Sequence, residues 1–312
     1  MARIGHSELD VFPIGLGGNV FGFTADRDTS FDILDAWVAG GANFIDTSDS
    51  YSAWVPGNHG GESETIIGEW LAARPGTRGR VVIATKVAQH PEHRGLAPDN
   101  IRAAITASLA RLGTDHIDLY YAHEDDPSVP LTDVVATFGA LVTEGLVRAV
   151  AVSNFTAERI EEWVSIADGG PGTPVAIQPH YNLVHRDEVE ASIIPVAERH
   201  GLSLVPYFGL AKGFLTGKYR SANLPSGASP RAAGAVAYAT PQGLKLLEVL
   251  DGVAQAHGVS VAAVALAWLR HRPTVVAPLA SASRVTQVAD LLTAGRLELA
   301  QAEVEALAHA GR

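Results

Sequence analysis

Four side chains of the types used in proton transfer follow apolar segments of the chain. Asp46 and Tyr51 come after one such segment, and Lys86 and His123 end the next two. A charged group beside an apolar run is costly unless it is paired, so packing alone does not explain the set. The pKa of a tyrosine phenol is about 10, and a neighbouring ammonium lowers it and makes the phenol a better proton donor. If Asp46 holds Lys86 and His123 orients a bound carbonyl, the set suits protonation of a carbonyl oxygen as hydride reaches its carbon.

Each of the four residues also has an ordinary explanation when it is taken alone. Asp46 can be a salt-bridge partner, and Tyr51 an aromatic residue of a loop. Lys86 can be a Schiff-base lysine, which would make the chain an aldolase. His123 can be a histidine whose hydrogen bonds are satisfied inside the fold. We favour the catalytic interpretation because the four residue types occur together at successive strand ends.

Apolar segments of two kinds alternate along the chain and would position these residues. Short runs rich in β-branched residues predict buried parallel strands, at 11–18, 42–48, 81–87, 117–123, 147–155, 175–182, 203–209 and 274–280. Segments with a helical period of apolar residues lie between them, at 29–39, 62–73, 100–112, 131–144, 157–166, 188–200 and 259–270. The pattern is a repeating strand–helix unit.

Eight such units in 312 residues predict the α/β class and one domain, 1–312, with the (β/α)8 TIM-barrel fold. The long interval after the seventh strand is the exception. It holds a segment rich in Gly, Ala, Ser and Pro at 211–240, and then an extra helix at 241–257. We expect 211–240 to be a lid or binding loop, with a floppy surface insertion as the alternative. Residues 2–10 are expected to form a short hairpin that closes the bottom of the barrel.

Composition excludes several classes of protein and of site. The chain has 23 Lys and Arg against 34 Asp and Glu, a net charge of −11, which argues against nucleic acid and anionic membranes as partners. It has no cysteine, and therefore no disulfide, thiolate zinc site or cysteine nucleophile. It shows no signal-peptide core and no apolar window long enough to span a membrane, so we expect a cytoplasmic protein. The run 123–126, His-Glu-Asp-Asp, contains residue types that ligate metals, but we expect no metal there.

Longer motifs give the chain a family resemblance. They are Pro-Ile-Gly-Leu-Gly at 13–17, Asn-Phe-Ile-Asp-Thr-Ser at 43–48 with Tyr51, Gly-Glu-Ser-Glu at 61–64, Ile-Ala-Thr-Lys at 83–86, Ile-Asp-Leu-Tyr at 117–120 before His123, Val-Ser-Asn-Phe at 152–155, Gln178 with Tyr-Asn at 181–182, and Leu-Thr-Gly-Lys-Tyr at 215–219. With these motifs the chain resembles the aldo-keto reductase superfamily over nearly its full length. The resemblance implies a nicotinamide cofactor bound without a Rossmann domain. It also implies a tetrad of Asp46, Tyr51, Lys86 and His123, with Tyr51 as the acid in carbonyl reduction.

The resemblance also implies where the cofactor binds. At the nicotinamide end the implied residues are Ser153, Asn154 and Gln178 for the carboxamide and Tyr207 for ring stacking. The backbone of Leu210, Lys212 and Gly213 corresponds to the loop that covers the pyrophosphate. Relatives often have Ser-Pro-Leu after the aromatic residue, where this chain has Phe208-Gly209-Leu210. The diphosphate contacts are therefore expected to differ.

The adenosine end is implied by Ser281, Ser283, Arg284, Gln287 and Asp290, near the start of the last barrel helix. A helix N-terminus with a guanidinium suits a 2′-phosphate, so we expect NADP(H) as the cofactor, preferred over NADH. Leu291 stands where relatives have Asn, so adenine recognition is expected to differ. No second Arg or Lys lies near Arg284 in this segment, which leaves Arg284 to carry the discrimination.

The function implied is reduction of a small-molecule aldehyde or ketone with NADPH. Asn19, Phe21 and Trp54 are predicted to line the substrate pocket, with a structural role as the alternative for Trp54. A second hypothesis is a cofactor-sensing regulatory subunit, because channel β-subunits share this scaffold. The complete tetrad favours the enzyme.

Overall fold

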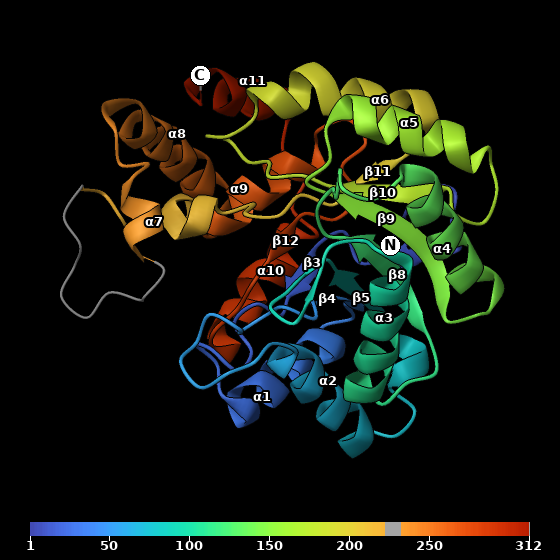
Figure 1. The fold of residues 1–312 in the computed structure, drawn as a ribbon. Coiled ribbons are helices and arrows are strands. Elements are labelled where there is room, and N and C mark those ends of the chain that lie inside the picture. The colour runs from blue at the N-terminus through green and yellow to red at the C-terminus, as the bar shows by residue number, and fades with distance from the viewer. Residues whose placement is uncertain (222–231, 312) are drawn as a thin grey trace.

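Eight parallel strands form one curved sheet at the centre of the molecule, shown in Figure 1 by a computed structural model that describes residues 1–221 and 232–311. The order is β11-β10-β9-β8-β5-β4-β3-β12. The strands are β3 (Gly15–Gly17), β4 (Phe44–Asp46), β5 (Val82–Val87), β8 (Ile117–Ala122), β9 (Val147–Ser153), β10 (Pro174–Gln178), β11 (Ser203–Leu204) and β12 (Leu279–Ala280). The backbone N–H of Leu204 donates to Thr274 O, and that of Val276 donates to Leu204 O. The segment before β12 therefore links both edges, which confirms the predicted (β/α)8 barrel.

Helices surround the sheet and follow the strands in the predicted alternation (Figure 1). They are α1 (Arg27–Ala39), α2 (Glu62–Ala73), α3 (Pro98–Leu112), α4 (Leu131–Thr143), α5 (Ala157–Ala167), α6 (Ile194–His200), α7 (Ala232–Val236), α8 (Pro241–His257), α9 (Val261–Arg270), α10 (Val288–Ala294) and α11 (Gln301–Ala310). Hydroxyl caps fix several starts, since Thr156, Thr240 and Ser260 each accept a backbone N–H from the first turn. Among the described residues no single helix is long and apolar enough to cross a membrane; α8 and α9 meet that test only together, as a pair bent by 95°.

Several strands are shorter than the apolar runs that predicted them, and proline explains three of the cases. Pro13, Pro206 and Pro278 lie within the runs at 11–18, 203–209 and 274–280. A proline has no N–H to donate to the sheet, so regular pairing stops although the chain stays extended and apolar. Proline also modifies the predicted helix 188–200. Its first half is a π-helical turn, Val189–Ile193, and Pro195 stands in the first turn of α6.

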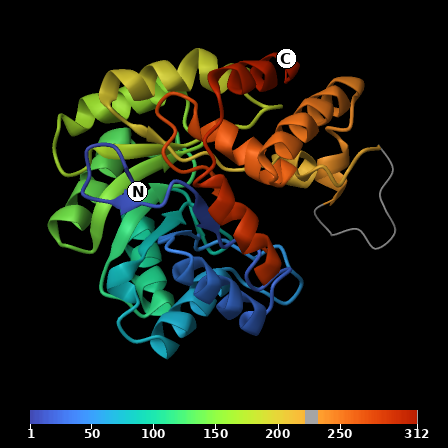
Figure 2. The ribbon, with the colours of Figure 1, turned by 180° about the vertical axis from the view of Figure 1, so that it is seen from behind.

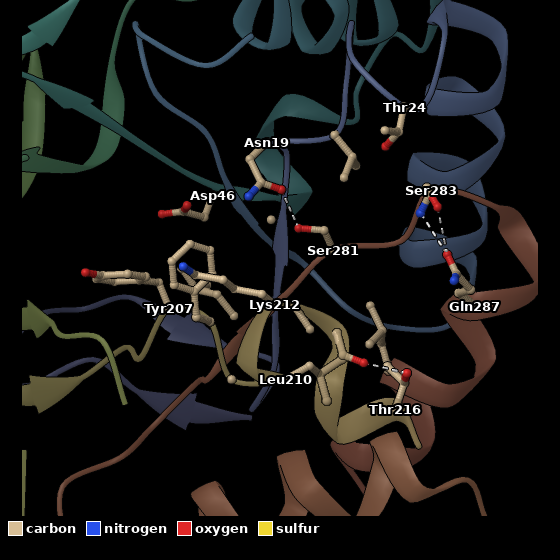
Figure 3. Close-up of a pocket in the computed structure, with 18 of the residues that line it drawn as sticks. Asn19, Thr24, Asp46, Tyr207, Leu210, Lys212, Thr216, Ser281, Ser283 and Gln287 are labelled. Atoms are coloured by element: carbon tan, nitrogen blue, oxygen red, sulfur yellow. Dashed lines mark hydrogen bonds between the residues drawn. The ribbon is translucent and has the colours of Figure 1, made fainter. Parts of the chain in front are cut away.

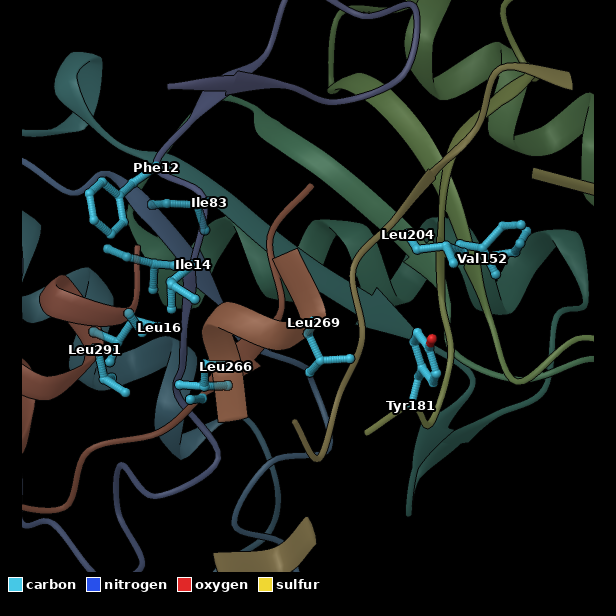
Figure 4. Close-up of a cluster of buried hydrophobic side chains, with 14 of the residues drawn as sticks. Phe12, Ile14, Leu16, Ile83, Val152, Tyr181, Leu204, Leu266, Leu269 and Leu291 are labelled. Carbon is cyan, nitrogen blue, oxygen red and sulfur yellow. The ribbon is translucent and has the colours of Figure 1, made fainter. Parts of the chain in front are cut away.

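Alternation along the strands separates two hydrophobic cores. On β5, Ile83 points outward to the helices, whereas Val82 and Ala84 point into the barrel. Figure 4 shows part of the outer core, which includes Leu16 and Ile83 from the strands, Leu266 of α9 and Leu291 of α10. The inner core consists mostly of the inward residues of successive strands. Because the alternation continues to the strand ends, it decides which polar residues face the barrel interior.

The predicted N-terminal hairpin is present as β1 (Ala2–Arg3) paired antiparallel with β2 (Asp10–Val11). Its loop carries Ile4 and Leu9, which belong to the inner core. Gly5 donates its N–H to Ser203 Oγ, at the N-terminal end of β11. A Cβ at Gly5 would stand 2.3 Å from Val175 O, so the close approach requires glycine. The hairpin therefore covers the bottom of the barrel, across which the N-terminal segment lies in Figure 2.

The long interval after β11 contains helical segments before and after residues 222–231, which lie outside the described residues. It begins with a 3-10 segment, Ala211–Thr216, and continues with α7 and α8, which lie together beside the barrel in Figure 1. A second short hairpin, β6 (Gln89–His90) with β7 (His93–Arg94), follows β5 and was not predicted. Gln89 of this hairpin and Lys212 of the 3-10 segment line one cavity together with Tyr51 and His123.

Candidate active site

Lys86 is the centre of the polar group at the C-terminal end of the barrel. It lies two positions beyond Ala84 on the inward side of β5, and its side chain is fully buried. Its Nζ donates to Asp46 Oδ1 at 2.7 Å, to the backbone oxygen of Thr47 at 2.7 Å and to Tyr51 Oη at 2.9 Å. Three acceptors match the three N–H bonds of an ammonium. The fold therefore brings Asp46, Tyr51 and Lys86 into direct contact.

Burial and charge act in opposite directions on this lysine. Burial lowers the pKa of Lys86, while the Asp46 carboxylate beside it raises that pKa. Asp46 is itself buried, and its second oxygen accepts from Gln178 Nε2 at 3.0 Å. Tyr51 Oη also lies 3.3 Å from Asp46 Oδ1. The phenol is thus placed where an ammonium can stabilise the negative charge that forms when its proton leaves.

His123 lies beside the Tyr51 ring, just after β8. The two rings meet edge to face, with centroids 6.3 Å apart. Burial, together with the positive charge of Lys86, holds the pKa of His123 well below its usual range. The imidazole is therefore neutral at pH 7, with one nitrogen as donor and the other as acceptor.

A large cavity of about 1330 Å³ opens above these residues. Residues predicted for catalysis, cofactor and substrate line it together: Asn19, Asp46, Tyr51, Trp54, His123, Asn154, Gln178, Tyr207, Leu210, Lys212, Gly213, Ser281, Ser283, Arg284, Gln287 and Asp290. Figure 3 shows Tyr207, Lys212, Ser281 and Gln287 around this space. One cavity thus runs from the Tyr51 phenol to the start of α10.

Three predicted site residues do not line the cavity. Lys86 lies beneath it and reaches it through Tyr51 Oη. Ser153 is fully buried and donates its hydroxyl to the backbone oxygen of Gln178. Phe21 corrects the sequence prediction: its side chain is fully buried in the outer core, and its backbone oxygen accepts from Ser52 Oγ. Phe21 therefore contributes to packing and to holding the loop after β4.

The mouth of the cavity beside Tyr51 is aromatic. Trp54 is 53% exposed, and its ring meets the Tyr51 ring at 6.2 Å and the Phe23 ring at 6.1 Å, each edge to face. An exposed indole beside the Tyr51 phenol gives this part of the cavity wall an apolar surface.

The far end of the cavity is polar. Ser281 Oγ donates to Asn19 Oδ1 at 2.7 Å, so Asn19 lies beside a residue predicted to bind the cofactor (Figure 3). Gln287 Oε1 accepts from the backbone N–H of Ser283 at 2.8 Å. Arg284 is exposed and has no ion-pair partner within residues 1–221 and 232–311. It directly precedes the 3-10 turn Val285–Gln287 that leads into α10.

Two lysines lie on the cavity wall in addition to Arg284. Lys212 and Lys218 line the same cavity, although both are distant from Arg284 in the sequence. Lys212 Nζ also lies 5.4 Å from the centre of the Phe208 ring. The sequence reasoning gave no role to Lys218, Thr216 or Gln89, which also line the cavity. The signal for Lys218 and Thr216 was present, since both stand in the matched run at 215–219.

The chain is similar in sequence to known proteins. The model of the Aldo/keto reductase family matches residues 13–312. The chain belongs to this family. The protein Tas of Escherichia coli is 32% identical over 335 aligned residues, which cover 98% of this chain and 96% of Tas.

Other relatives carry different names. The uncharacterised oxidoreductase YrpG of Bacillus subtilis is 32% identical over 305 residues, covering 95% of this chain and 91% of the relative. A rice protein named as a probable voltage-gated potassium channel subunit beta is 29% identical over 301 residues, covering 94% and 90%. As a member of the family, this chain is an oxidoreductase, and aldo/keto reductases use NAD(P)H with small-molecule carbonyl substrates.

The cavity has the chemical groups that such a dinucleotide needs. Asn154 and Gln178 offer amides that both donate and accept, and Tyr207 offers an aromatic face. Tyr207 Oη donates to Asn154 Oδ1 at 2.8 Å, which joins these two sides of the wall. Gly17 leaves room beside Ser281, because a Cβ there would stand 2.7 Å from Ser281 Oγ. Amides, an aromatic ring and cations in this order fit a nicotinamide, its ring face and its phosphates.

Proposed function

We propose that this chain reduces an aldehyde or ketone to an alcohol with NADPH, with Tyr51 as the general acid. The observation that carries the proposal is the contact between Lys86 Nζ and Tyr51 Oη, 2.9 Å long, at the floor of the cavity. The buried ammonium pairs with Asp46 and also donates to a phenol oxygen that faces the cavity. It favours loss of the phenol proton to a group bound there.

The residues of the chain would act on the carbonyl oxygen. When bound, a reduced nicotinamide supplies a hydride to the carbonyl carbon. Tyr51 Oη gives its proton to the carbonyl oxygen, and the Lys86 N–H bond stabilises the phenolate that remains. Asp46 holds Lys86 in place and charged. Neutral His123 donates a hydrogen bond to the same carbonyl oxygen and orients it.

The proposal is tested by following NADPH absorbance with a panel of small aldehydes, quinones, keto-sugars and sugar aldehydes. Turnover of at least one class is the expected result. The relative named as a channel subunit beta supports a second candidate, a cofactor-binding regulatory subunit with little turnover. Tight NADPH binding without turnover of any carbonyl compound would favour that second candidate. Schiff-base chemistry would instead appear as borohydride trapping of a substrate on Lys86.

We propose NADPH as the preferred cofactor, and expect Arg284→Ala to weaken NADPH binding while leaving NADH nearly unchanged. The exposed guanidinium at the entry to α10 suits a dianionic 2′-phosphate that NADH lacks. A hydrogen bond to a charged group contributes roughly 1.5–3 kcal/mol, so the Kd for NADPH should rise at least about tenfold. Fluorescence titration of both cofactors measures the change. Arg94→Ala serves as the control, because Arg94 is exposed on β7 and does not line the cavity. Equal weakening for both cofactors would show that Arg284 does not read the phosphate.

We also expect Trp54→Ala to raise KM for aromatic aldehydes. The exposed indole makes edge contacts beside the phenol, and an aromatic pair contributes about 0.5–1.5 kcal/mol, or roughly two- to tenfold in KM. The melting temperature should not change, because Trp54 is 53% exposed. Steady-state kinetics with an aromatic and a small aliphatic aldehyde check the effect. A similar change for both substrates, or a loss of stability, would assign Trp54 a structural role.

A further inference from the structure

A chain of buried polar groups leads away from the active-site histidine. His123 Nδ1 lies 3.3 Å from Ser48 Oγ, and Ser48 Oγ lies 3.2 Å from Asp49 Oδ1. All three residues are buried, with Ser48 at 0%, Asp49 at 1% and His123 at 8% exposure. The other oxygen of Asp49 has no hydrogen-bond partner among the residues that the structure describes. The carboxyl group of Asp49 thus ends a hydrogen-bond path that begins at His123.

The hydroxyl of Ser48 can pass only one proton along this path. Ser50 donates its backbone N–H to Ser48 Oγ at 3.2 Å, which occupies one lone pair, and Ser50 Oγ lies 3.0 Å away. If Asp49 is ionised, its carboxylate is the strongest acceptor and takes the Ser48 proton. If the Ser50 hydroxyl does not donate to Ser48 Oγ, the remaining lone pair of Ser48 Oγ accepts from His123 Nδ1–H. The neutral ring has no second proton, so Nε2 is unprotonated and cannot donate a hydrogen bond to a carbonyl oxygen in the cavity.

The opposite arrangement follows if Asp49 is protonated. The carboxylic acid then donates to Ser48 Oγ, and the Ser48 hydroxyl donates to His123 Nδ1. The single ring proton therefore resides on Nε2, where it can be donated to a carbonyl oxygen. We propose that Asp49, held protonated and acting through Ser48, keeps His123 in the Nε2–H tautomer that carbonyl reduction needs. Ser48 and Asp49 are then positioning residues, and the inference rests on the proposed reductase function.

The surroundings of Asp49 support its protonated form. The pKa of Asp49 is raised to about 8: burial raises it most and the negative charge of Glu64 on α2 also raises it, while the Ser48 hydroxyl and the charges of Arg111 on α3 and Lys86 on β5 lower it. The carboxylate of Glu64 bonds to groups other than Asp49: it accepts from Thr85 Oγ1 at 2.5 Å and from Arg111 Nε at 2.7 Å. The phenol of Tyr120 on β8 faces the same region, and burial holds its pKa well above the usual range. No ammonium or guanidinium donates to Asp49 within the described part of the chain.

The pH dependence follows from the direction of this shift. A carboxyl group whose pKa is raised to about 8 is protonated at pH 7 and ionises as the pH rises through that value. The His123 tautomer should therefore switch from Nε2–H to Nδ1–H over the same range. At about pH 9 roughly one carboxyl in ten remains protonated, so kcat for reduction should fall about tenfold from its value near pH 7.

Imidazole nitrogen chemical shifts of the full chain test the tautomer directly, with His123→Gln used to assign the His123 signals. The parent should show the Nε2–H tautomer at pH 7 and Nδ1–H at about pH 9. Asp49→Asn replaces the acid by an amide that also donates and cannot ionise. It should keep the Nε2–H tautomer at both pH values, and its kcat for p-nitrobenzaldehyde should fall less than the parent's as the pH rises.

Ser48→Ala breaks the path without touching either end. In this variant the His123 tautomer should no longer respond to Asp49 or to pH between 7 and 9. The kcat of the variant at pH 7 should fall about tenfold, the effect expected from the loss of one hydrogen bond. Ser30→Ala is the matched control, because Ser30 is equally buried and donates only to backbone oxygens around the start of α1. It should behave as the parent does.

Two outcomes would overturn the inference. One is an Nδ1–H tautomer in the parent at pH 7, and the other is a tautomer that ignores both Asp49→Asn and Ser48→Ala. If Asp49→Asn does not fold, Ser48→Ala carries the test. If the His123 tautomer responds as expected but no carbonyl compound is reduced, control of the tautomer by Asp49 through Ser48 is supported and the proposed reductase function fails.

Discussion

The variant Tyr51→Phe should fold, bind NADPH as the parent does, and lose carbonyl reduction by about 10²–10⁴-fold in kcat. The substitution removes the phenolic oxygen that accepts from Lys86 Nζ and leaves the ring in place. Edge contacts of that ring with Trp54 and His123 persist, so packing changes little. Lys86 keeps its other two acceptors, Asp46 Oδ1 and Thr47 O. The substitution therefore removes the proton donor together with its hydrogen bonds to Lys86 Nζ and Asp46 Oδ1, and keeps the ring.

The measurement pairs NADPH consumption with a fluorescence titration of the cofactor. Tyr238→Phe is the matched control, because Tyr238 is partly buried against Phe214 and does not line the cavity. It removes a phenolic oxygen at a site without a role in turnover, so its kcat should equal that of the parent. Near-normal turnover in Tyr51→Phe would remove Tyr51 from the acid role. Loss of NADPH binding in that variant would mean that the phenol supports the cofactor site instead.

The fold was predictable because hydrophobic patterning records burial. On β5, Val82 and Ala84 point inward and Ile83 points outward, and the neighbouring strands alternate in the same way. Strands that are apolar on both faces and alternate with helices are typical of a closed (β/α)8 barrel. Strand ends were less predictable, since an apolar run continues through Pro206 although hydrogen bonding to the neighbouring strand does not. The helix α11 was missed because Val304 and Leu307 give only a short apolar stripe.

The site was predictable to the extent that strand position determines it. Lys86 faces inward because it keeps the parity of Val82 and Ala84. Loop residues follow no such rule. Phe21 was placed on the wrong side of its loop, where a turn after β3 directs its ring into the outer core. The contact of Ser48 Oγ with His123 Nδ1 depends on a turn after β4 and joins residues 75 positions apart, which periodicity cannot show.

Lys86→Met should reduce kcat as strongly as Tyr51→Phe and should also destabilise the fold. The substitution removes the ammonium that stabilises the phenolate, so proton donation by Tyr51 becomes slow. It also leaves the buried Asp46 carboxylate without its cation, and removing one partner of a buried pair costs about 3–5 kcal/mol. Gln178 Nε2 would remain as a donor to the other oxygen of Asp46. Thermal unfolding and NADPH consumption measure the two effects.

The double variant Lys86→Met with Asp46→Asn separates these effects. An amide at position 46 carries no charge, so the buried site no longer holds an unpaired carboxylate, and much of the lost stability should return. Activity should not return, because the phenol still lacks its ammonium. Recovery of both stability and kcat in the double variant would mean that Lys86 acts only by neutralising Asp46. Unchanged stability in Lys86→Met alone would show that Asp46 is protonated or solvated once the lysine is gone, and that the ion pair contributes to chemistry more than to folding.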